Sequence, residues 1–344
     1  MLGTEDDNAA ASATITEDAK SCAQCGSTNP DLKRCVACKS VFYCGTTCQR
    51  SHRKAHKKEC KRRAFELDVK LAKSKRPECP VCMYILPVTN DGCTYMVCCG
   101  KHTCHACMIE HCIAHARADK DCPFCRTPLP RSGVEASKKL LARIEKGDTN
   151  AMQNLSFCYI NGNAYPYHDI EKDEKKGIEL LQRAVDLGSA DACFFMGNIY
   201  IDGLQVPRDY DKAEQLLTQS AKAGSAEGAY LLSKFYVKVR PNVSKFVYYL
   251  RLSAAMGYEV AMTTLAGEYT NSENVRKVLK KDEFEATLRS FQATQDEMNS
   301  EARKKWGKES TISLTTAGYS WETLELYQKG VISSLLSTKK LVNV

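Results

Sequence analysis

The sequence predicts a multidomain chain in which two small zinc-stabilised modules precede an all-α solenoid of helix-pair repeats. Three observations indicate this fold class. Seventeen of the nineteen cysteines and six of the seven histidines lie between residues 22 and 125. Beyond Cys125, glycines and tyrosines recur at intervals of 33 to 41 residues. At 344 residues, of which 43% are hydrophobic and 26% charged, the chain has room for two or three globular domains.

Dense cysteine indicates either a disulfide framework or metal sites. Disulfide frameworks belong to small secreted chains, but residues 1–20 are acidic and polar and lack the apolar segment of a signal peptide. We expect residues 1–20 to be a disordered acidic tail, and the protein to be intracellular, in the cytoplasm, the nucleus or both. No run of about 18 apolar residues occurs, so no membrane span is expected. Cysteine interleaved with histidine therefore predicts zinc.

Residues 21–60 are expected to form the first module. Two tetrahedral zinc ions take eight nitrogen or sulfur donors, and such coordination stabilises small modules that have almost no apolar core. His56 and Cys60 are four residues apart, so both would project from one face of a helix. His52 is the rival histidine on this helix. The eight candidate ligands are Cys22, Cys25, Cys35, Cys38, Cys44, Cys48, His56 and Cys60.

With its segments VFYC (41–44) and HKKEC (56–60), this block resembles a MYND zinc finger. The resemblance implies two interleaved ligand sets, Cys22, Cys25, Cys44 and Cys48 for one ion and Cys35, Cys38, His56 and Cys60 for the other. His52 would then be an exposed helix residue. The family also implies a module that binds proline-containing peptides, with Gln49 beside the groove. Arg53 stands where the family usually has tryptophan, which removes a large apolar contact surface.

A basic helical connector is predicted over residues 61–77. From Arg50 to Arg76 there are twelve lysines and arginines but three acidic residues. Such a run is compatible with nuclear import or nucleic-acid binding. Apart from Phe65 no aromatic residue interleaves the charges to stack on bases. We therefore interpret the run as a solvated helix face and do not expect nucleic acid as a partner.

Residues 78–127 are expected to form the second module. CPxC segments at both ends and a CG-x-x-x-C-x-x-C centre resemble a RING finger, and the resemblance places Cys79, Cys82, Cys104 and Cys107 on one ion. The second ion would take Cys122, Cys125 and two central residues. Lys101 cannot serve as a zinc donor, so either Cys99 acts with His102, which we prefer, or Cys98 and Cys99 both contribute. Cys93 and Cys112 are expected to be small buried residues, and His111 and His115 to be solvated.

RING fingers that act as ubiquitin ligases hold a charged conjugating enzyme and perform no covalent chemistry themselves. The resemblance assigns that contact to Val81, Pro123 and Arg126, and an arginine at this position could donate hydrogen bonds to both the conjugating enzyme and ubiquitin. The alternative is a non-catalytic adaptor, possibly nuclear, whose fingers are purely structural. A methyltransferase built around the first finger is not expected, because the residues after Cys60 lead into the connector and the second block.

Helical repeats are predicted over residues 134–270. Gly147, Gly188, Gly224 and Gly257 recur, and each is followed at matched offsets by a small residue, an apolar residue and a tyrosine. A second helix lies between successive glycines, so each unit is a helix pair and the units stack as an α-solenoid. The segment from Gly188 to Ala213 resembles Sel-1-like repeats, which implies a scaffold with a concave surface for partner proteins.

Residues 271–344 are predicted to be a C-terminal helical extension. Its two apolar stripes would be packing surfaces, one formed by Phe284, Leu288 and Phe291 and the other by Trp321, Leu324, Tyr327 and Val331. The sequence as a whole predicts four zinc ions, two per module, in a protein whose partners are proteins. These would be a conjugating enzyme at the RING-like block, and peptides or target proteins at the MYND finger and the repeats.

Overall fold

A computed structural model describes residues 21–28, 31–88, 92–114, 121–130, 132–162, 170–299 and 303, without the side chains of residues 112–114. The chain divides into two compact units, Met1–Leu67 and Asp68–Val344. The predicted acidic tail, His115 and the stripe from Trp321 to Val331 lie outside the described residues. So do residues 163–169.

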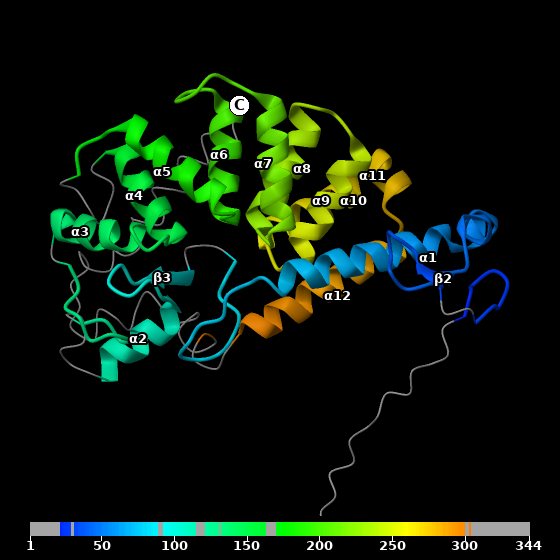
Figure 1. Ribbon diagram of the computed structural model, residues 1–344, viewed down its shortest axis with the longest axis horizontal. Coiled ribbons are helices and arrows are strands. Elements are labelled where there is room, and N and C mark those ends of the chain that lie inside the picture. Colours follow the sequence, from blue (N-terminus) through cyan, green and yellow to red (C-terminus); the bar gives the residue numbers. More distant parts are fainter. Residues whose placement is uncertain are drawn as a thin grey trace, which may run out of the picture. The chain divides into compact units, whose positions relative to one another are not determined.

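The first unit is a small zinc-finger fold. Strand β1 (Lys33–Arg34) pairs antiparallel with β2 (Phe42–Tyr43), and helix α1 (Thr46–Lys73) follows. Its buried cluster consists of three cysteines and Tyr43. Helix α1 continues past Cys60, so the expected connector is the same helix as far as Lys73 (Figure 1). A core this small cannot offset the entropy of chain ordering without metal.

The second unit begins at Asp68, near the end of α1, and continues into another cysteine-rich block. Strands β3 (Cys93–Tyr95) and β4 (His102–Cys104) form an antiparallel pair in which Cys93 faces Cys104 and Tyr95 faces His102. Helix α2 (His105–Ala114) follows directly.

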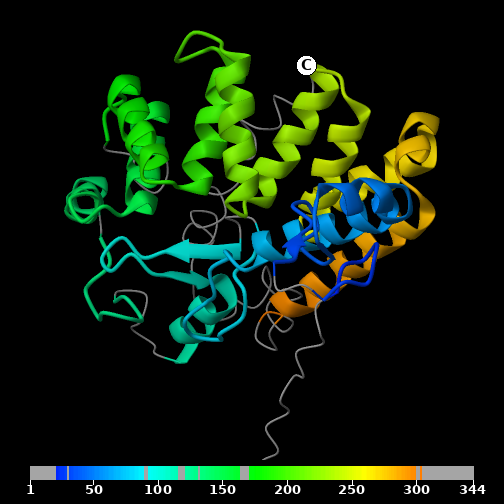
Figure 2. The ribbon, with the colours of Figure 1, turned by 45° about the vertical axis from the view of Figure 1, so that its right-hand side comes forward.

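Helices α3 to α12 make up the rest of the described second unit. After α3, three antiparallel pairs stack in chain order, α4 with α5, α6 with α7 and α8 with α9, and α10 to α12 complete the stack (Figures 1 and 2). The predicted solenoid of helix pairs is therefore confirmed. The bounds of these helices are α3 (Gly133–Ile144), α4 (Thr149–Asn161), α5 (Glu174–Asp186), α6 (Ala190–Asp202), α7 (Tyr210–Lys222), α8 (Ala226–Lys238), α9 (Val243–Ala255), α10 (Glu259–Asn271), α11 (Glu273–Val278) and α12 (Lys281–Met298).

Each repeat turns at a glycine that ends one helix, followed by a residue that begins the next. Gly147, Gly188, Gly224 and Gly257 have φ values of 78°, 82°, 99° and 91°, in the left-handed region that favours glycine after a helix C-terminus. The following residue caps the next helix in three of these turns, because the side chains of Asp148, Ser189 and Ser225 accept backbone N–H bonds. The left-handed turn and the capping residue after it explain why glycine recurs at matched positions of the repeats.

The repeat core uses the small and apolar positions of the predicted pattern. Ala151, Ala192 and Ala261 are completely buried, and Gly228 lies so close to Ser220 that an added Cβ would stand 2.1 Å from its hydroxyl oxygen. Leu155, Met196, Leu232 and Leu265 are at most 1% exposed. Phe284, Leu288 and Phe291 of α12 pack against the same core, so the first apolar stripe of the extension serves the solenoid.

The cysteine-rich block and the last turns of α1 lie along the edge of the solenoid where the second helix of each pair ends. The Tyr95 hydroxyl donates to Asp148, at the start of α4, over 2.8 Å. Lys75 Nζ donates to the carbonyl of Lys222 at the end of α7 over 2.7 Å, and Arg76 Nη1 to that of Met256 after α9 over 3.0 Å. These cations satisfy helix C-terminal carbonyls and complement the helix dipole. The chain itself therefore occupies this edge.

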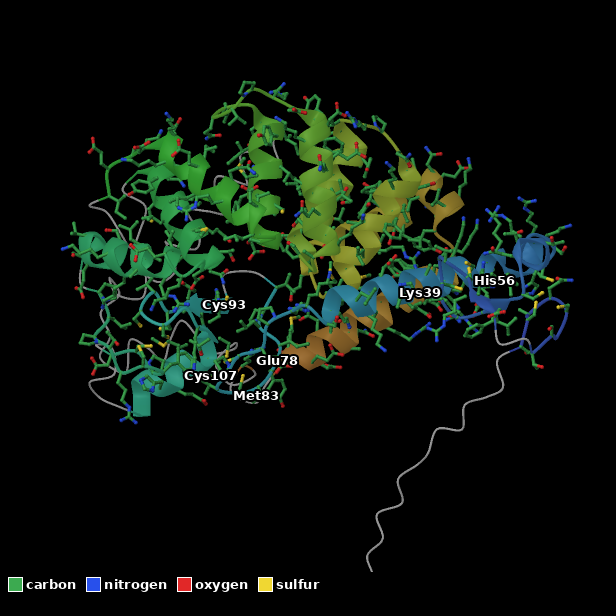
Figure 3. The ribbon with its side chains drawn as sticks, viewed as in Figure 1. Lys39, His56, Glu78, Met83, Cys93 and Cys107 are labelled. Atoms are coloured by element: carbon green, nitrogen blue, oxygen red, sulfur yellow. The ribbon has the colours of Figure 1, made fainter. Side chains whose placement is uncertain are left out.

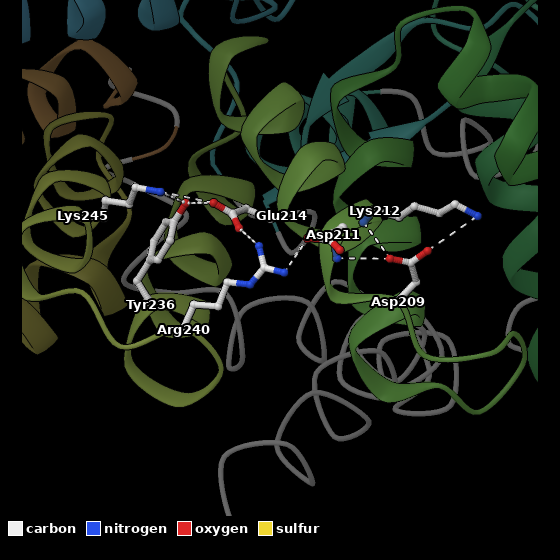
Figure 4. A network of polar contacts seen from close by, with 7 residues as sticks. All are labelled: Asp209, Asp211, Lys212, Glu214, Tyr236, Arg240 and Lys245. Atoms are coloured by element: carbon white, nitrogen blue, oxygen red, sulfur yellow. Dashed lines mark hydrogen bonds and ion pairs between the residues drawn. The ribbon is translucent and has the colours of Figure 1, made fainter.

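A polar network joins α7 to α8 and α9 (Figure 4). Glu214, whose side chain is 21% exposed, accepts hydrogen bonds from Tyr236, from Arg240 Nη1 over 2.5 Å and from Lys245 Nζ over 3.3 Å. Lys245 also lies 4.5 Å above the centre of the Tyr236 ring. The repeat tyrosine is thus held at its hydroxyl and at its face, which fixes its side chain within the stack. No helix among the described residues is both long enough and apolar enough to cross a membrane.

Candidate zinc centres

Cysteine and histidine side chains gather in four clusters, two in each module. Within every cluster the four donor atoms lie within 4.8 Å of one another. Taken in chain order, the pairs alternate between the two clusters of each module, so the sites are interleaved. The clusters are Cys22, Cys25, Cys44 and Cys48; Cys35, Cys38, His56 and Cys60; Cys79, Cys82, Cys104 and Cys107; and Cys98, Cys99, Cys122 and Cys125.

The distances within the clusters fit zinc. With a Zn–S bond of about 2.3 Å, a regular tetrahedron has S···S edges of about 3.8 Å. The observed Sγ···Sγ separations include 3.6 Å for Cys25 and Cys44, 3.7 Å for Cys35 and Cys60, 3.9 Å for Cys82 and Cys104 and 3.7 Å for Cys99 and Cys122. Disulfides, with S–S near 2.05 Å, are much shorter. With all four positions taken by protein donors, such sites are structural rather than catalytic.

Four of the eight ligand pairs sit on the same type of turn, which we call a knuckle, and Cys98 and Cys99 sit on a variant of it. The residue after the second cysteine donates its N–H to the carbonyl of the first, as Lys39 does to Cys35 over 2.9 Å and Met83 to Cys79 over 2.8 Å. It also adopts a positive φ, 51° at Lys39, 60° at Met83 and 56° at Arg126. This residue is Gly26 at the first knuckle and Gly100 at the variant turn, where its N–H donates to the carbonyl of Met96. For glycine the conformation carries little strain.

In the first module His56 is the histidine of the cluster, with Nε2 3.4 Å from Cys38 Sγ. Figure 3 labels His56 and also Lys39, the residue that follows Cys38 in the chain. His52, expected to be exposed, is half-buried: its Nδ1 lies 3.0 Å from the Tyr43 hydroxyl and its ring stacks on His56 at 5.7 Å. That expectation is corrected because the helix carries both rings toward buried Tyr43. His52 therefore supports the ligand without joining it.

In the second module the structure gathers Cys98 where the preferred expectation had His102. The turn at Met96 explains this: the N–H groups of Cys99 and Gly100 both donate to the Met96 carbonyl, and this places Cys98 and Cys99 together at the tip. His102 lies on β4 with its ring 5.1 Å from that of Tyr95, and burial lowers its pKa. The alternative in which both cysteines contribute is thus the one that the geometry matches.

Membership of a cluster, and not the pKa of the thiol, distinguishes a ligand from a leftover cysteine, because ligands such as Cys48 and Cys60 also have raised pKa values. Burial acts to raise the pKa of Cys79, but backbone N–H groups, led by that of Cys104 at 3.4 Å, outweigh it and lower the pKa to about 6. This favours the thiolate that zinc requires. In Cys93, by contrast, burial raises the pKa to about 12, and its thiol belongs to none of the four clusters. Cys93 is half-buried, close to the small buried residue that was expected.

The predicted partner-binding residues lie at or next to knuckle tips. Val81 is 54% exposed, Arg126 is exposed and Pro123 is half-buried. Sequence reasoning missed Met83, which is 67% exposed and extends the apolar tip beside Val81 (Figure 3). The sequence signal that could have identified Met83 is its position directly after the second cysteine of a CPxC segment. In the first module, Gln49 is half-buried in the first turns of α1.

The model of the MYND finger family matches residues 22–60, and that of the Sel1 repeat matches residues 149–189 and 190–225. Among curated proteins, a histone-lysine N-methyltransferase of Arabidopsis thaliana is 48% identical over 46 residues. That stretch is 13% of this chain and 9% of the relative, so the likeness is confined to a small part of that enzyme.

Solved structures similar to the chain include other repeat proteins. A Sel1 repeat protein from Oxalobacter formigenes is 20% identical with a TM-score of 0.40, and the match covers 59% of this chain and 80% of that protein. A protective antigen of uropathogenic Escherichia coli with an SLR fold is 24% identical with a TM-score of 0.40, covering 60% and 42%. An immunity protein from Pseudomonas aeruginosa is 23% identical with a TM-score of 0.35, covering 66% and 81%.

MYND fingers bind zinc, and both matched families are protein-interaction modules. Its four clusters fit the four zinc ions predicted from the sequence. Residues 22–60 are a MYND finger, and residues 149–225 belong to the Sel1 repeats.

Proposed function

We propose that this chain is a scaffold for protein partners and a RING-type ubiquitin-ligase-like protein of the cytoplasm or nucleus. Its second zinc block, within residues 78–127, would recruit a conjugating enzyme, while the MYND finger and the repeats would hold the target. The observation that carries the proposal is the interleaved pair of clusters at Cys79–Cys107 and Cys98–Cys125. Zinc would serve there to fix two knuckles in place, with Cys98 rather than His102 completing the second site.

The chemistry proposed for the block is positioning. Val81 at the tip of one knuckle offers an apolar contact, and Pro123 shapes the other. Arg126 follows Cys125 in a left-handed conformation, which a non-glycine residue adopts at a cost of about 1–2 kcal/mol. Its guanidinium would donate to both the conjugating enzyme and ubiquitin, holding the thioester in a reactive orientation.

Target binding would use surfaces that the chain leaves open. The repeat edge at the ends of α7 and α9 is already covered by Lys75 and Arg76. A hollow of about 720 Å³ lies beside α7, with Asp211, Glu214 and Arg240 among its lining residues and Lys75 at the covered edge. In the MYND finger, Gln49 would contact a peptide, while exposed Arg53 adds charge where an aromatic platform would otherwise lie.

The alternative is a non-catalytic adaptor in which the second block serves the fold alone. It is favoured by the packing of this block on the repeats, since Val97 belongs to the same buried cluster as Leu140 and Ile144 of α3. The two functions make opposite predictions for a knuckle-tip substitution that leaves zinc in place.

Self-ubiquitination of the purified full chain with a panel of conjugating enzymes tests the proposal. We expect activity with at least one enzyme, and its loss in Val81→Ala and in Arg126→Gly. The glycine variant relieves the left-handed strain while removing the guanidinium, so lost activity cannot be ascribed to misfolding. Lys39→Gly, the equivalent change in the MYND finger, is the matched control and should keep full activity. Absence of activity with every enzyme in the panel would favour the adaptor.

A further inference from the structure

We propose that one face of α1 in the first unit is a docking surface for the phosphate backbone of nucleic acid. This basic face consists of Arg50, Arg53, Lys54, Lys57 and Lys61, all exposed. At 3.6 residues per turn the five side chains fall within an arc of about 100°, and at 1.5 Å per residue the face extends about 16 Å along the helix. The charges therefore form a continuous stripe and do not surround the helix.

The charge of the whole first unit supports the stripe. Residues 21–67 contain eleven lysines and arginines against three acidic residues. Two zinc ions held by seven thiolates contribute three net negative charges, so the metal-loaded finger keeps a net charge of five positive. A positive potential of this size attracts polyanions over about one Debye length, about 8 Å at physiological salt.

The carboxylates that could neutralise the stripe are engaged elsewhere. Glu59 accepts hydrogen bonds from Arg62 and from Arg63, both over 2.6 Å. Glu66 pairs with Arg62 over 2.5 Å. Among the described residues, no carboxylate lies within ion-pairing distance of the five side chains of the basic face. Their charge is available to a ligand.

The composition of the face favours a phosphate backbone over a protein. Protein interfaces have cores that are depleted in charge and enriched in aromatic side chains. No large hydrophobic side chain between Thr46 and Leu67 is exposed among the described residues. The basic face carries no aromatic group for base stacking either, so binding would be independent of sequence and dominated by counterion release. This revises the expectation that nucleic acid is not a partner.

Fluorescence anisotropy of the zinc-loaded full chain with a labelled random-sequence duplex DNA tests the proposal. Five phosphate contacts predict a slope of log K against log salt of about −4.5, which is a loss of affinity of about 500-fold between 50 and 200 mM salt. Lys54→Gln combined with Lys57→Gln should make the slope shallower by about two and weaken binding at 50 mM by at least about tenfold.

The matched control is Arg62→Gln combined with Arg63→Gln, which removes the same formal charge from side chains already paired with Glu59. It should leave the salt slope nearly unchanged, and zinc content should remain four per chain in both double variants. Equal loss in the two double variants would overturn the proposal, because it would indicate net charge rather than the basic face. So would stronger binding to polyglutamate or to phosphatidylserine vesicles than to DNA.

Discussion

The MYND finger buries three cysteines, Tyr43 and His56 in a core of its own, whereas in the second zinc block Val97 packs into the core of α3 to α6. The knuckles of the two modules are nevertheless alike in hydrogen bonding and backbone conformation. Similar local chemistry can therefore support either an independent module or part of a larger fold. The side chains outside the ligand pairs decide whether the module is independent or part of a larger fold.

Long polar side chains outside the ligand pairs also connect the second block to the rest of its unit. Tyr95 reaches Asp148, and Arg76 donates both to Met256 and, over 2.6 Å, to the carbonyl of Leu86 next to the first knuckle. Arg303 donates to the Ile85 carbonyl, also over 2.6 Å. Zinc in the second block should therefore stabilise the solenoid, and zinc in the MYND finger should not.

The largest effect is expected from removing one zinc ligand in each module. Cys104→Ser should release zinc from the second block and unfold much of the second unit, because zinc coordination supplies about 10 kcal/mol or more to small metal-stabilised folds. Cys38→Ser should release zinc from the finger and leave the unfolding of the helices unchanged. Zinc content and circular dichroism on heating check both. If the two variants lowered the helical transition equally, the proposed difference between the modules would be wrong.

A smaller effect is expected at Asp148, whose side chain is 8% exposed. It caps α4, pairs with Arg143 over 2.6 Å and accepts from Tyr95. Asp148→Ala removes the cap and leaves half-buried Arg143 and Tyr95 without this partner, so we expect a loss of about 3 kcal/mol. Chemical denaturation measures it. Ser189→Ala, which removes a cap alone, is the matched control and should cost about 1 kcal/mol.

The same carboxylate gives a pH dependence. Burial acts to raise the pKa of Asp148, but hydrogen bonds from Arg143 and Tyr95 lower it below its ordinary value. A lowered pKa means that the unfolded chain takes up the proton first as pH falls. The stabilisation is therefore complete above about pH 5, decreases as pH falls below about 4, and is absent below the native pKa. Asp148→Ala should remove this part of the acid sensitivity.

Much of the fold could be predicted from the sequence, because period and spacing are local properties. The intervals between Gly147, Gly188, Gly224 and Gly257 reflect one turn geometry repeated, and CxxC spacing reflects one knuckle repeated. The choice between Cys98 and His102 was different. It depends on the turn at Met96, where methionine takes the place that a cysteine holds in the other knuckles.

The covered edge of the solenoid could not be predicted either. The sequence predicts that Lys75 and Arg76 belong to a solvated basic run, and nothing in their spacing distinguishes them from Lys54 or Lys57. The structure separates them by partner: Lys75 and Arg76 donate to carbonyls 147 and 180 residues away. Contacts of such separation depend on how the helices stack, and the sequence pattern does not specify that stacking.

Alanine substitutions at two repeat glycines compare a turn at the covered edge of the solenoid with a turn that nothing covers. A Cβ at Gly224 would stand 2.7 Å from the Ala72 carbonyl oxygen, whereas at Gly147 it would meet nothing within 4 Å. Both residues have positive φ, so each alanine variant bears a strain of about 1–2 kcal/mol. Gly224→Ala should cost more than Gly147→Ala, by about 1–3 kcal/mol, because a backbone oxygen cannot move aside cheaply. Denaturation of the two single variants compares them, and equal losses would argue against close packing of α1 on the repeats.

The smallest effect concerns the left-handed residues that the two modules share. Lys39 in the MYND finger and Arg126 in the second block have φ values of 51° and 56°. Replacing either with glycine relieves about 1–2 kcal/mol of strain, partly offset by the greater freedom of glycine in the unfolded chain. We expect a net stabilisation of at most about 1 kcal/mol. For Lys39→Gly it should appear as slower zinc transfer to a chelator. For Arg126→Gly it should also raise the midpoint of helical unfolding, because in the second block the knuckle and the solenoid unfold together. A rise of that midpoint in Lys39→Gly would instead mean that the finger is coupled to the repeats.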